Sequence, residues 1–178
     1  TVPSSMKQIC TSVVSEGGYN LRGSIAGCGR GFTLADAQVL GTAGTEYPLI
    51  AIRLREGRKY SVAIPNTFKI FCPGNKSVSY RVWVGAVVTG GTWEVRPDDS
   101  CVEFNVGVTG MTVTGARLVQ GGFVVNNSAE TAGTGELDNL HYQLQYHADG
   151  TRPILLLSAI PTENNVGVLS KVDWAELV

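Results

Sequence analysis

The chain has 178 residues, with 14 Lys and Arg against 15 Asp and Glu, so its formal net charge is −1. This near-neutral balance disfavours a nucleic-acid-binding protein that relies on a general positive field, and the sequence contains no apolar run long enough for a membrane span. Charged residues make up only 16% and apolar residues 43% of the chain, which excludes disorder and allows one full-sized core.

Alternating apolar and polar residues predict β-strands along nearly the whole chain. In residues 50–55, Ile50, Ile52 and Leu54 share one face, and the opposite face ends in Arg53 and Arg55, which we expect to meet water. Residues 154–160 are apolar on both faces and are bounded by prolines, which predicts a central strand covered on both sides. The last strand is expected to turn Val166, Val168, Val172 and Trp174 to one side, with Lys171 and Asp173 facing outward.

Turn residues separate these runs at short intervals, and the 22 glycines are scattered among them. Asp149-Gly150 is expected to join residues 140–147 and 152–160 in a hairpin. No segment predicts a convincing amphipathic helix, the best candidates being residues 34–40 and 136–140. Strands are expected near residues 6–14, 32–40, 47–55, 59–64, 67–72, 77–89, 101–106, 111–125, 140–147, 153–160 and 166–175.

About nine to eleven short strands with little helix are typical of an antiparallel β-sandwich, and variable strand lengths favour a jelly-roll-like arrangement. We expect one all-β domain over residues 1–178. The chain starts at Thr1 with neither an initiator methionine nor a signal peptide, so we expect that further chain precedes this sequence in the natural product.

The four cysteines, Cys10, Cys28, Cys72 and Cys101, include no C-x-x-C pair, which disfavours a zinc or thioredoxin-type motif. Buried free thiols are the favoured interpretation. One or two disulfides remain an alternative if the protein works outside a cell.

The sequence offers little support for a metal site. His141 and His147 would share one face of a strand, but six residues separate them by about 20 Å, too far to bind one ion together. Asp98 and Asp99, followed by Glu103, could form a weak cation site, but they lack calcium-loop spacing, so a solvated turn is favoured. We expect neither a metal nor a cofactor.

Catalytic motifs are equally weak. Ser158 lies inside the most apolar run, without a G-x-S-x-G elbow or a histidine near it in sequence. Residues 27–31 and Gly121-Gly122 lack the context of nucleotide-binding loops and are interpreted as turns. No pair of acids can be selected for glycoside hydrolysis, so we expect a protein that is not an enzyme.

Aromatic and arginine side chains form the remaining class of candidates. Arg53, Arg55, Trp93, Tyr142 and Tyr146 are candidates for an interface or for contact with sugars. The simpler interpretation of the two tyrosines is that they share a core face with Leu144. Residues of these types indicate binding or assembly.

Residues at both ends and in the middle of the chain resemble one group of proteins. Residues 7–23 (KQICTSVVSEGGYNLRG), 149–159 (DGTRPILLLSA) and 168–177 (VLSKVDWAEL), with PLIAIRL, VAIP and GGF between them, are similar to uncharacterised virion structural proteins of tailed bacteriophages, especially phages of aquatic bacteria.

The resemblance implies a decoration, cement or fibre protein located in the virion, and it implies no catalytic residues. It implies contacts with other copies, expected as a trimer, and with other virion proteins, through surfaces and edge strands that neighbours cover. The alternative is a lectin-like fibre-tip module that binds host glycans through exposed aromatic residues.

Overall fold

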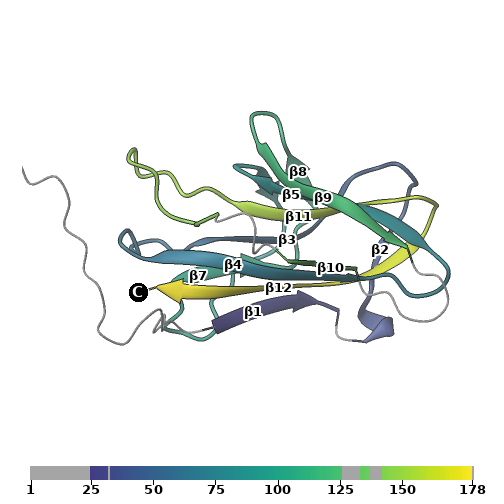
Figure 1. The fold of residues 1–178 in the computed structure, drawn as a ribbon, viewed down its shortest axis with the longest axis horizontal. Helices are drawn as coiled ribbons and strands as arrows, with labels where there is room; N and C mark the ends of the chain where they lie inside the picture. The colour runs from purple at the N-terminus through teal and green to yellow at the C-terminus, as the bar shows by residue number, and fades with distance from the viewer. Residues whose placement is uncertain (1–24, 32, 126–132, 137–141, 178) are drawn as a thin grey trace, which may run out of the picture.

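The computed structural model describes residues 25–31, 33–125, 133–136 and 142–177, and these form antiparallel β-sheets packed in layers (Figure 1). The expected strand at residues 6–14 lies outside the described residues. Within the described residues the only helical element is the 3-10 turn η1 (Leu34–Asp36), and no helix has the length and apolarity needed to cross a membrane.

Two five-stranded sheets form the body of the described structure. The first sheet has the order β1-β12-β4-β10, with β2 also paired to β12, and the second has the order β7-β3-β11-β5-β9. The first consists of β1 (Ile25–Arg30), β2 (Gln38–Leu40), β4 (Val62–Phe71), β10 (Gly133–Glu136) and β12 (Val166–Leu177). The second consists of β3 (Tyr47–Leu54), β5 (Ser77–Val84), β7 (Val102–Asn105), β9 (Arg117–Val125) and β11 (Leu155–Pro161).

Successive strands cross between the two sheets. The chain runs from β3 in the second sheet to β4 in the first and back to β5, and β9, β10, β11 and β12 alternate in the same way. Such crossings are what a jelly-roll-like sandwich requires, because each connection must close an end of the sandwich. The predicted antiparallel all-β sandwich with little helix is therefore confirmed.

The main core lies between the sheets and follows the alternation of β12. Val166, Val168, Val172 and Trp174 all point inward, as predicted, and Trp174 is completely buried. Lys171, between them, faces outward and is exposed. One cluster of buried side chains joins these residues to inward-facing residues of the second sheet such as Ile52, so the two sheets share one core.

A small third sheet covers part of the second sheet from outside. It pairs β6 (Val87–Thr89) with β8 (Gly110–Thr112), and beneath it Ala51, Ala86, Val108 and Leu156 form a second buried cluster. The central strand β11 is thus covered on both faces, as predicted. The expectation that the outer face of β3 meets water is wrong at Ala51, which is fully buried by this layer.

Several strand boundaries differ from the prediction for local reasons. The expected strand 77–89 is divided at Gly85, and the expected strand 111–125 is divided near Gly115, because both glycines adopt positive φ. The two runs at 59–64 and 67–72 form one strand, β4, in which Pro65 lies beside an irregularity in the pairing with β12. The interpretation of residues 27–31 and of Gly121-Gly122 as turns is wrong, because residues 27–30 belong to β1 and both glycines lie inside β9, where a neighbouring strand pairs with each.

The predicted strand at 140–147 and its hairpin with β11 are wrong in the described part. Both edges of β11 are occupied, by β3 and by β5, so residues 142–147 have no place beside it. Leu144 instead forms one isolated bridge with Ala63 in the first sheet. The turn at Asp149-Gly150 does form, closed by a hydrogen bond from the Gly150 N–H to the His147 carbonyl.

Replacing Trp174 with alanine should lower the free energy of unfolding by about 3–5 kcal/mol, because the change leaves a large cavity in the core. Chemical denaturation would measure this loss. The matched control is Tyr60→Ala, since Tyr60 is fully exposed and its removal should change stability by less than about 0.5 kcal/mol. A loss below about 1 kcal/mol for Trp174→Ala would contradict its role in the core.

Candidate functional site

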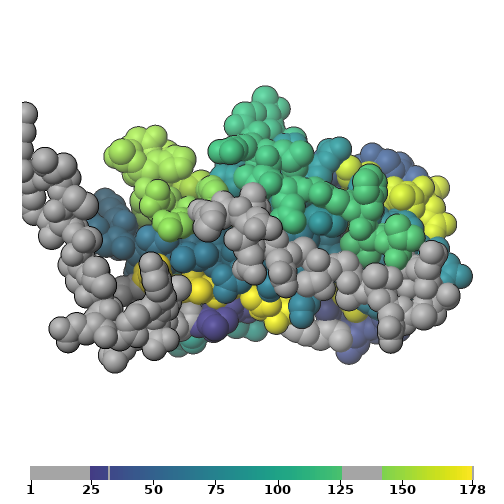
Figure 2. Space-filling model, viewed as in Figure 1, coloured from purple at the N-terminus to yellow at the C-terminus, as the bar shows by residue number. Residues whose placement is uncertain are grey.

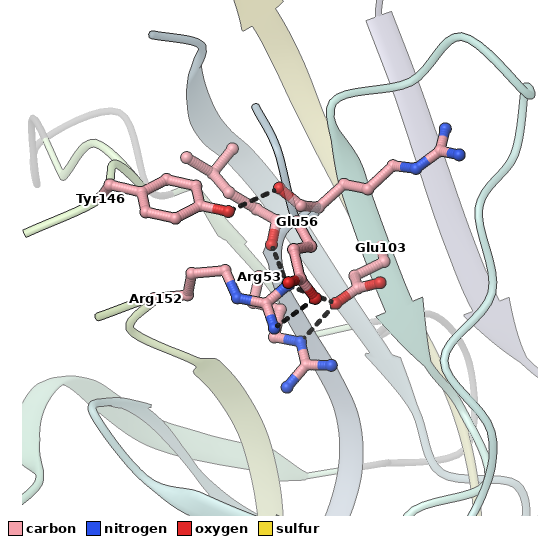
Figure 3. A network of polar contacts seen from close by, with 7 residues as sticks. Arg53, Glu56, Glu103, Tyr146 and Arg152 are labelled. Carbon is pink, nitrogen blue, oxygen red and sulfur yellow. Dashed lines mark hydrogen bonds and ion pairs between the residues drawn. The ribbon is translucent and has the colours of Figure 1, made fainter. Parts of the chain in front are cut away.

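Charged side chains gather where β3 and β7 pair at one end of the second sheet (Figure 3). Arg53 and Glu103 lie directly opposite each other, and the Arg53 Nε is 2.6 Å from the Glu103 Oε1. Arg152 approaches the same oxygen at 3.1 Å and donates to the Leu54 carbonyl at 3.3 Å. The Glu103 carboxylate, with 14% of its side chain exposed, is therefore held between two guanidinium groups.

Trp93 completes this group from the outside of the sheet. The Arg53 guanidinium carbon lies 3.8 Å from the centroid of the Trp93 ring, a cation–π arrangement. Trp93 is half-buried and also packs against the cluster beneath the small third sheet. The indole ring of Trp93 is thus in contact both with Arg53 and with the buried cluster beneath the small third sheet.

Arg55 follows the end of β3 and connects two loops. Its backbone N–H donates to the Cys101 carbonyl at 2.7 Å, and its guanidinium donates to the Asp98 carbonyl at 2.9 Å. Its own carbonyl accepts a hydrogen bond from the Tyr146 hydroxyl at 3.0 Å (Figure 3). Arg58 donates to the Asp99 carbonyl at 3.4 Å, so two cations lie against the acidic turn at 98–99. That arrangement disfavours the weak cation site considered from the sequence.

Tyr142 and Tyr146 pack against the main core, which agrees with the simpler interpretation of the sequence. Leu144 is buried, Tyr142 and Tyr146 are half-buried against the main core, and Gln143 and Gln145 between them are exposed. Burial raises the pKa of the Tyr142 hydroxyl, and the charge of Arg117 opposes that rise. Of the five predicted candidates, Arg53, Arg55, Trp93 and Tyr146 meet at this end of the second sheet, whereas Tyr142 lies near Arg117.

A second polar cluster lies on the outer face of the second sheet, around Glu46. Its Oε1 accepts hydrogen bonds from the Trp83 indole at 2.7 Å and the Ser158 hydroxyl at 2.6 Å. Its Oε2 accepts one from the Arg81 guanidinium at 2.9 Å. Ser158 is fully buried, and its hydroxyl is used in the hydrogen bond to the Glu46 carboxylate.

A third cluster surrounds Glu176, which is 1% exposed. The Trp174 indole donates to its Oε1 at 2.7 Å, and the Ser100 hydroxyl donates to the same oxygen at 2.5 Å. The Cys101 backbone N–H donates to Oε2 at 2.8 Å. The donors to this carboxylate come from both sheets, because Trp174 lies on β12 of the first sheet and Ser100 and Cys101 directly precede β7 of the second.

The sequence did not identify the three glutamates at the centres of these clusters, Glu46, Glu103 and Glu176, as hydrogen-bond or ion-pair partners of other residues. Glu103 was considered only with the acidic turn, and Glu46 gave no signal. Glu176 did have one, because it shares the inward parity of Val172 and Trp174 on the last strand.

Two cysteines are buried thiols, as the sequence favoured. Burial, the largest cause, raises the pKa of Cys28 to about 12 and the pKa of Cys101 to about 12. Both therefore remain protonated and weakly nucleophilic at neutral pH. Cys72 is also buried, and Cys10 lies outside the described residues.

The glutamates at the centres of the three clusters accept hydrogen bonds from donors of the chain itself. Among the described residues, no group of three or more His, Cys, Asp or Glu side chains could hold a metal ion. His147 is exposed beside the Thr151 hydroxyl, and His141 lies outside the described part. Comparisons of the chain with models of protein families, with curated proteins and with solved structures give no significant match.

Replacing Glu103 with glutamine should lower the free energy of unfolding by about 1–2 kcal/mol, because two largely buried arginines lose their shared carboxylate. Denaturant titration would measure the loss. The control is Glu94→Gln, which disrupts the exposed Arg96–Glu94 pair and should cost less than about 0.5 kcal/mol. Equal effects of the two changes would contradict the structural role of Glu103.

Replacing Glu176 with glutamine should cost about 1–3 kcal/mol, since the amide cannot accept from all three donors in place of the carboxylate. Native-state hydrogen exchange should show faster exchange of the Cys101 amide, which loses its acceptor. Glu163→Gln is the control, because Glu163 is exposed on a loop. An unchanged Cys101 amide would show that Glu176 does not hold this loop.

Proposed function

We propose that this protein is a non-enzymatic structural component of a tailed-bacteriophage virion, of decoration, cement or fibre type. It acts through contacts with other copies of itself in a symmetric oligomer and with other virion proteins. The proposal is supported by the resemblance of residues near both ends and in the middle of the chain to such proteins. A sandwich of two open sheets also suits this function, because its faces and edge strands can meet neighbours.

The observation that carries the proposal is the amount of apolar side chain left at the surface. Nine large hydrophobic residues of the described part are at least 37% exposed, on a chain with only 16% charged residues. Such residues favour burial against another protein where several lie on one surface, as Leu118, Phe123 and Val125 do on β9 (Arg117–Val125). The nine are Ile25, Leu34, Val39, Tyr60, Phe71, Val87, Leu118, Phe123 and Val125.

The polar clusters also support a role in assembly over one in ligand binding. Glu46, Glu103 and Glu176 each accept hydrogen bonds from donors within the chain, so these three carboxylates are already occupied. The glycan-binding alternative receives less support, because Trp93 already packs against Arg53 and the cluster behind it. Tyr146 likewise donates its hydroxyl to the Arg55 carbonyl.

Immunogold electron microscopy of purified native particles would test the proposal. An antibody raised against the recombinant chain should label heads or fibres, and label should vanish when the antibody is first absorbed with that chain. Recovery of the protein only in the soluble fraction, with unlabelled particles, would overturn the proposed function.

A further inference from the structure

Strand β9 is an edge of the second sheet, and in the described residues its only strand partner is β5. The N–H and C=O groups on its other side point away from β5, as in any edge strand, and can pair with a further strand. Figure 2 shows green surface from the β8 and β9 part of the chain open on the viewed side. The edge is therefore the place where the second sheet could be extended.

The outward side chains of β9 are apolar and exposed. Phe123 is 79% exposed, Val125 50% and Leu118 48%, so a third of the large exposed hydrophobic residues lie on this one strand. The register with β5 gives their direction. Val125 lies opposite Ser77, Phe123 opposite Ser79 and Leu118 opposite Trp83. Val124, between them, points into the core and is buried.

Residues 118–125 contain an irregularity in the pairing with β5 between Val82 and Trp83, but they lack two other devices that normally protect an edge. They contain no charged residue and no proline. The opposite edge strand, β7, is bridged by reciprocal hydrogen bonds between Glu94 and Phe104. The exposed face of the first sheet carries charge across its centre, where Lys69 lies opposite Lys171 beside Asp173. In the described part of the chain, the outer edge of β9 has no such bridge, and Arg117 at its start is its only charged residue.

Two glycines keep the middle of this strand thin. A Cβ at Gly122 would lie 2.6 Å from the Tyr80 hydroxyl oxygen, so the absence of a side chain there lets the Tyr80 ring pack beneath the strand. Gly121 faces outward and is exposed, which leaves backbone uncovered next to Phe123. A neighbouring strand could approach this backbone without steric hindrance from side chains.

We infer that β9 is the contact between two copies of this chain, paired antiparallel about a twofold axis perpendicular to the sheet. The inference deepens the proposed function and rests on it. A second copy fits best because residues 118–125 carry no charge and the Arg117 residues of two antiparallel copies would lie at opposite ends of the contact, so the strand meets itself without like-charge repulsion. The twofold axis also gives the antiparallel direction and brings the apolar side chains of both copies onto one face. The two second sheets would then form one continuous sheet.

This contact implies an even number of copies. A threefold axis cannot place β9 against itself, so a trimer, which the family resemblance implies, would require a different surface. The number of copies in solution therefore distinguishes the two arrangements.

Sedimentation equilibrium of the complete chain over a wide concentration range would test the contact. The wild-type chain should form dimers, and Phe123→Asp should raise the dissociation constant at least about thirtyfold by placing a charge in the apolar contact. Tyr60→Asp is the matched control: Tyr60 is fully exposed in the loop between β3 and β4, outside β9, and its replacement should leave the dimer unchanged. Phe123→Ser, a milder change, provides a second variant if the aspartate disturbs folding.

Hydrogen exchange would distinguish strand pairing from simple packing. Amides of β9 that do not bond to β5 should exchange slowly in the dimer and rapidly in Phe123→Asp. A wild-type monomer at all concentrations, a trimer, or a dimer that Phe123→Asp leaves intact would overturn the inference. Particle labelling tests the proposed function separately, because a virion protein could assemble through another surface.

Discussion

The rest of the structure depends on the buried carboxylate of Glu176, because it connects the two sheets at one end. Glu176 belongs to β12 in the first sheet, and it accepts hydrogen bonds from Ser100 and Cys101, just before β7 in the second. Trp174, two residues earlier, fills the core and donates to the same carboxylate. A buried charge is stable only when donors surround it, so these contacts specify how the sheets meet.

The placement of β7 then determines the polar end of the molecule. Once β7 pairs with β3, Glu103 lies beside Arg53, and Arg152 can reach the same carboxylate. The charges at this end neutralise one another within the chain. The edge at β9 has no charge from residue 118 to 125 and leaves Phe123 exposed. The charged residues at the polar end pair with one another, whereas the apolar residues of β9 remain exposed. For this reason we propose that β9, and not the polar end, is the contact between copies.

The sequence nominated side chains at the site but not their partners. Alternation in residues 50–55 placed Arg53 on the outer face, yet Glu103 lies 50 positions away and Arg152 nearly 100. Only the register between β3 and β7 brings them together, and register depends on packing of the whole sheet. Glu176 is different, because it shares the parity of Trp174, but the expected strand ended at residue 175 and so gave Glu176 no direction.

By itself the sequence determined the all-β class, the positions of most strands and the inward direction of residues such as Trp174. A strand shows which faces it buries through a period of two, and that signal is local. Tertiary structure decided which strands pair and what covers their outer faces. It buried Ala51 beneath β6 and β8, and it excluded residues 142–147 from the second sheet because β3 and β5 occupy both edges of β11. Strand pairing is a competition among distant segments for a limited number of edges, and local periodicity contains no record of its outcome.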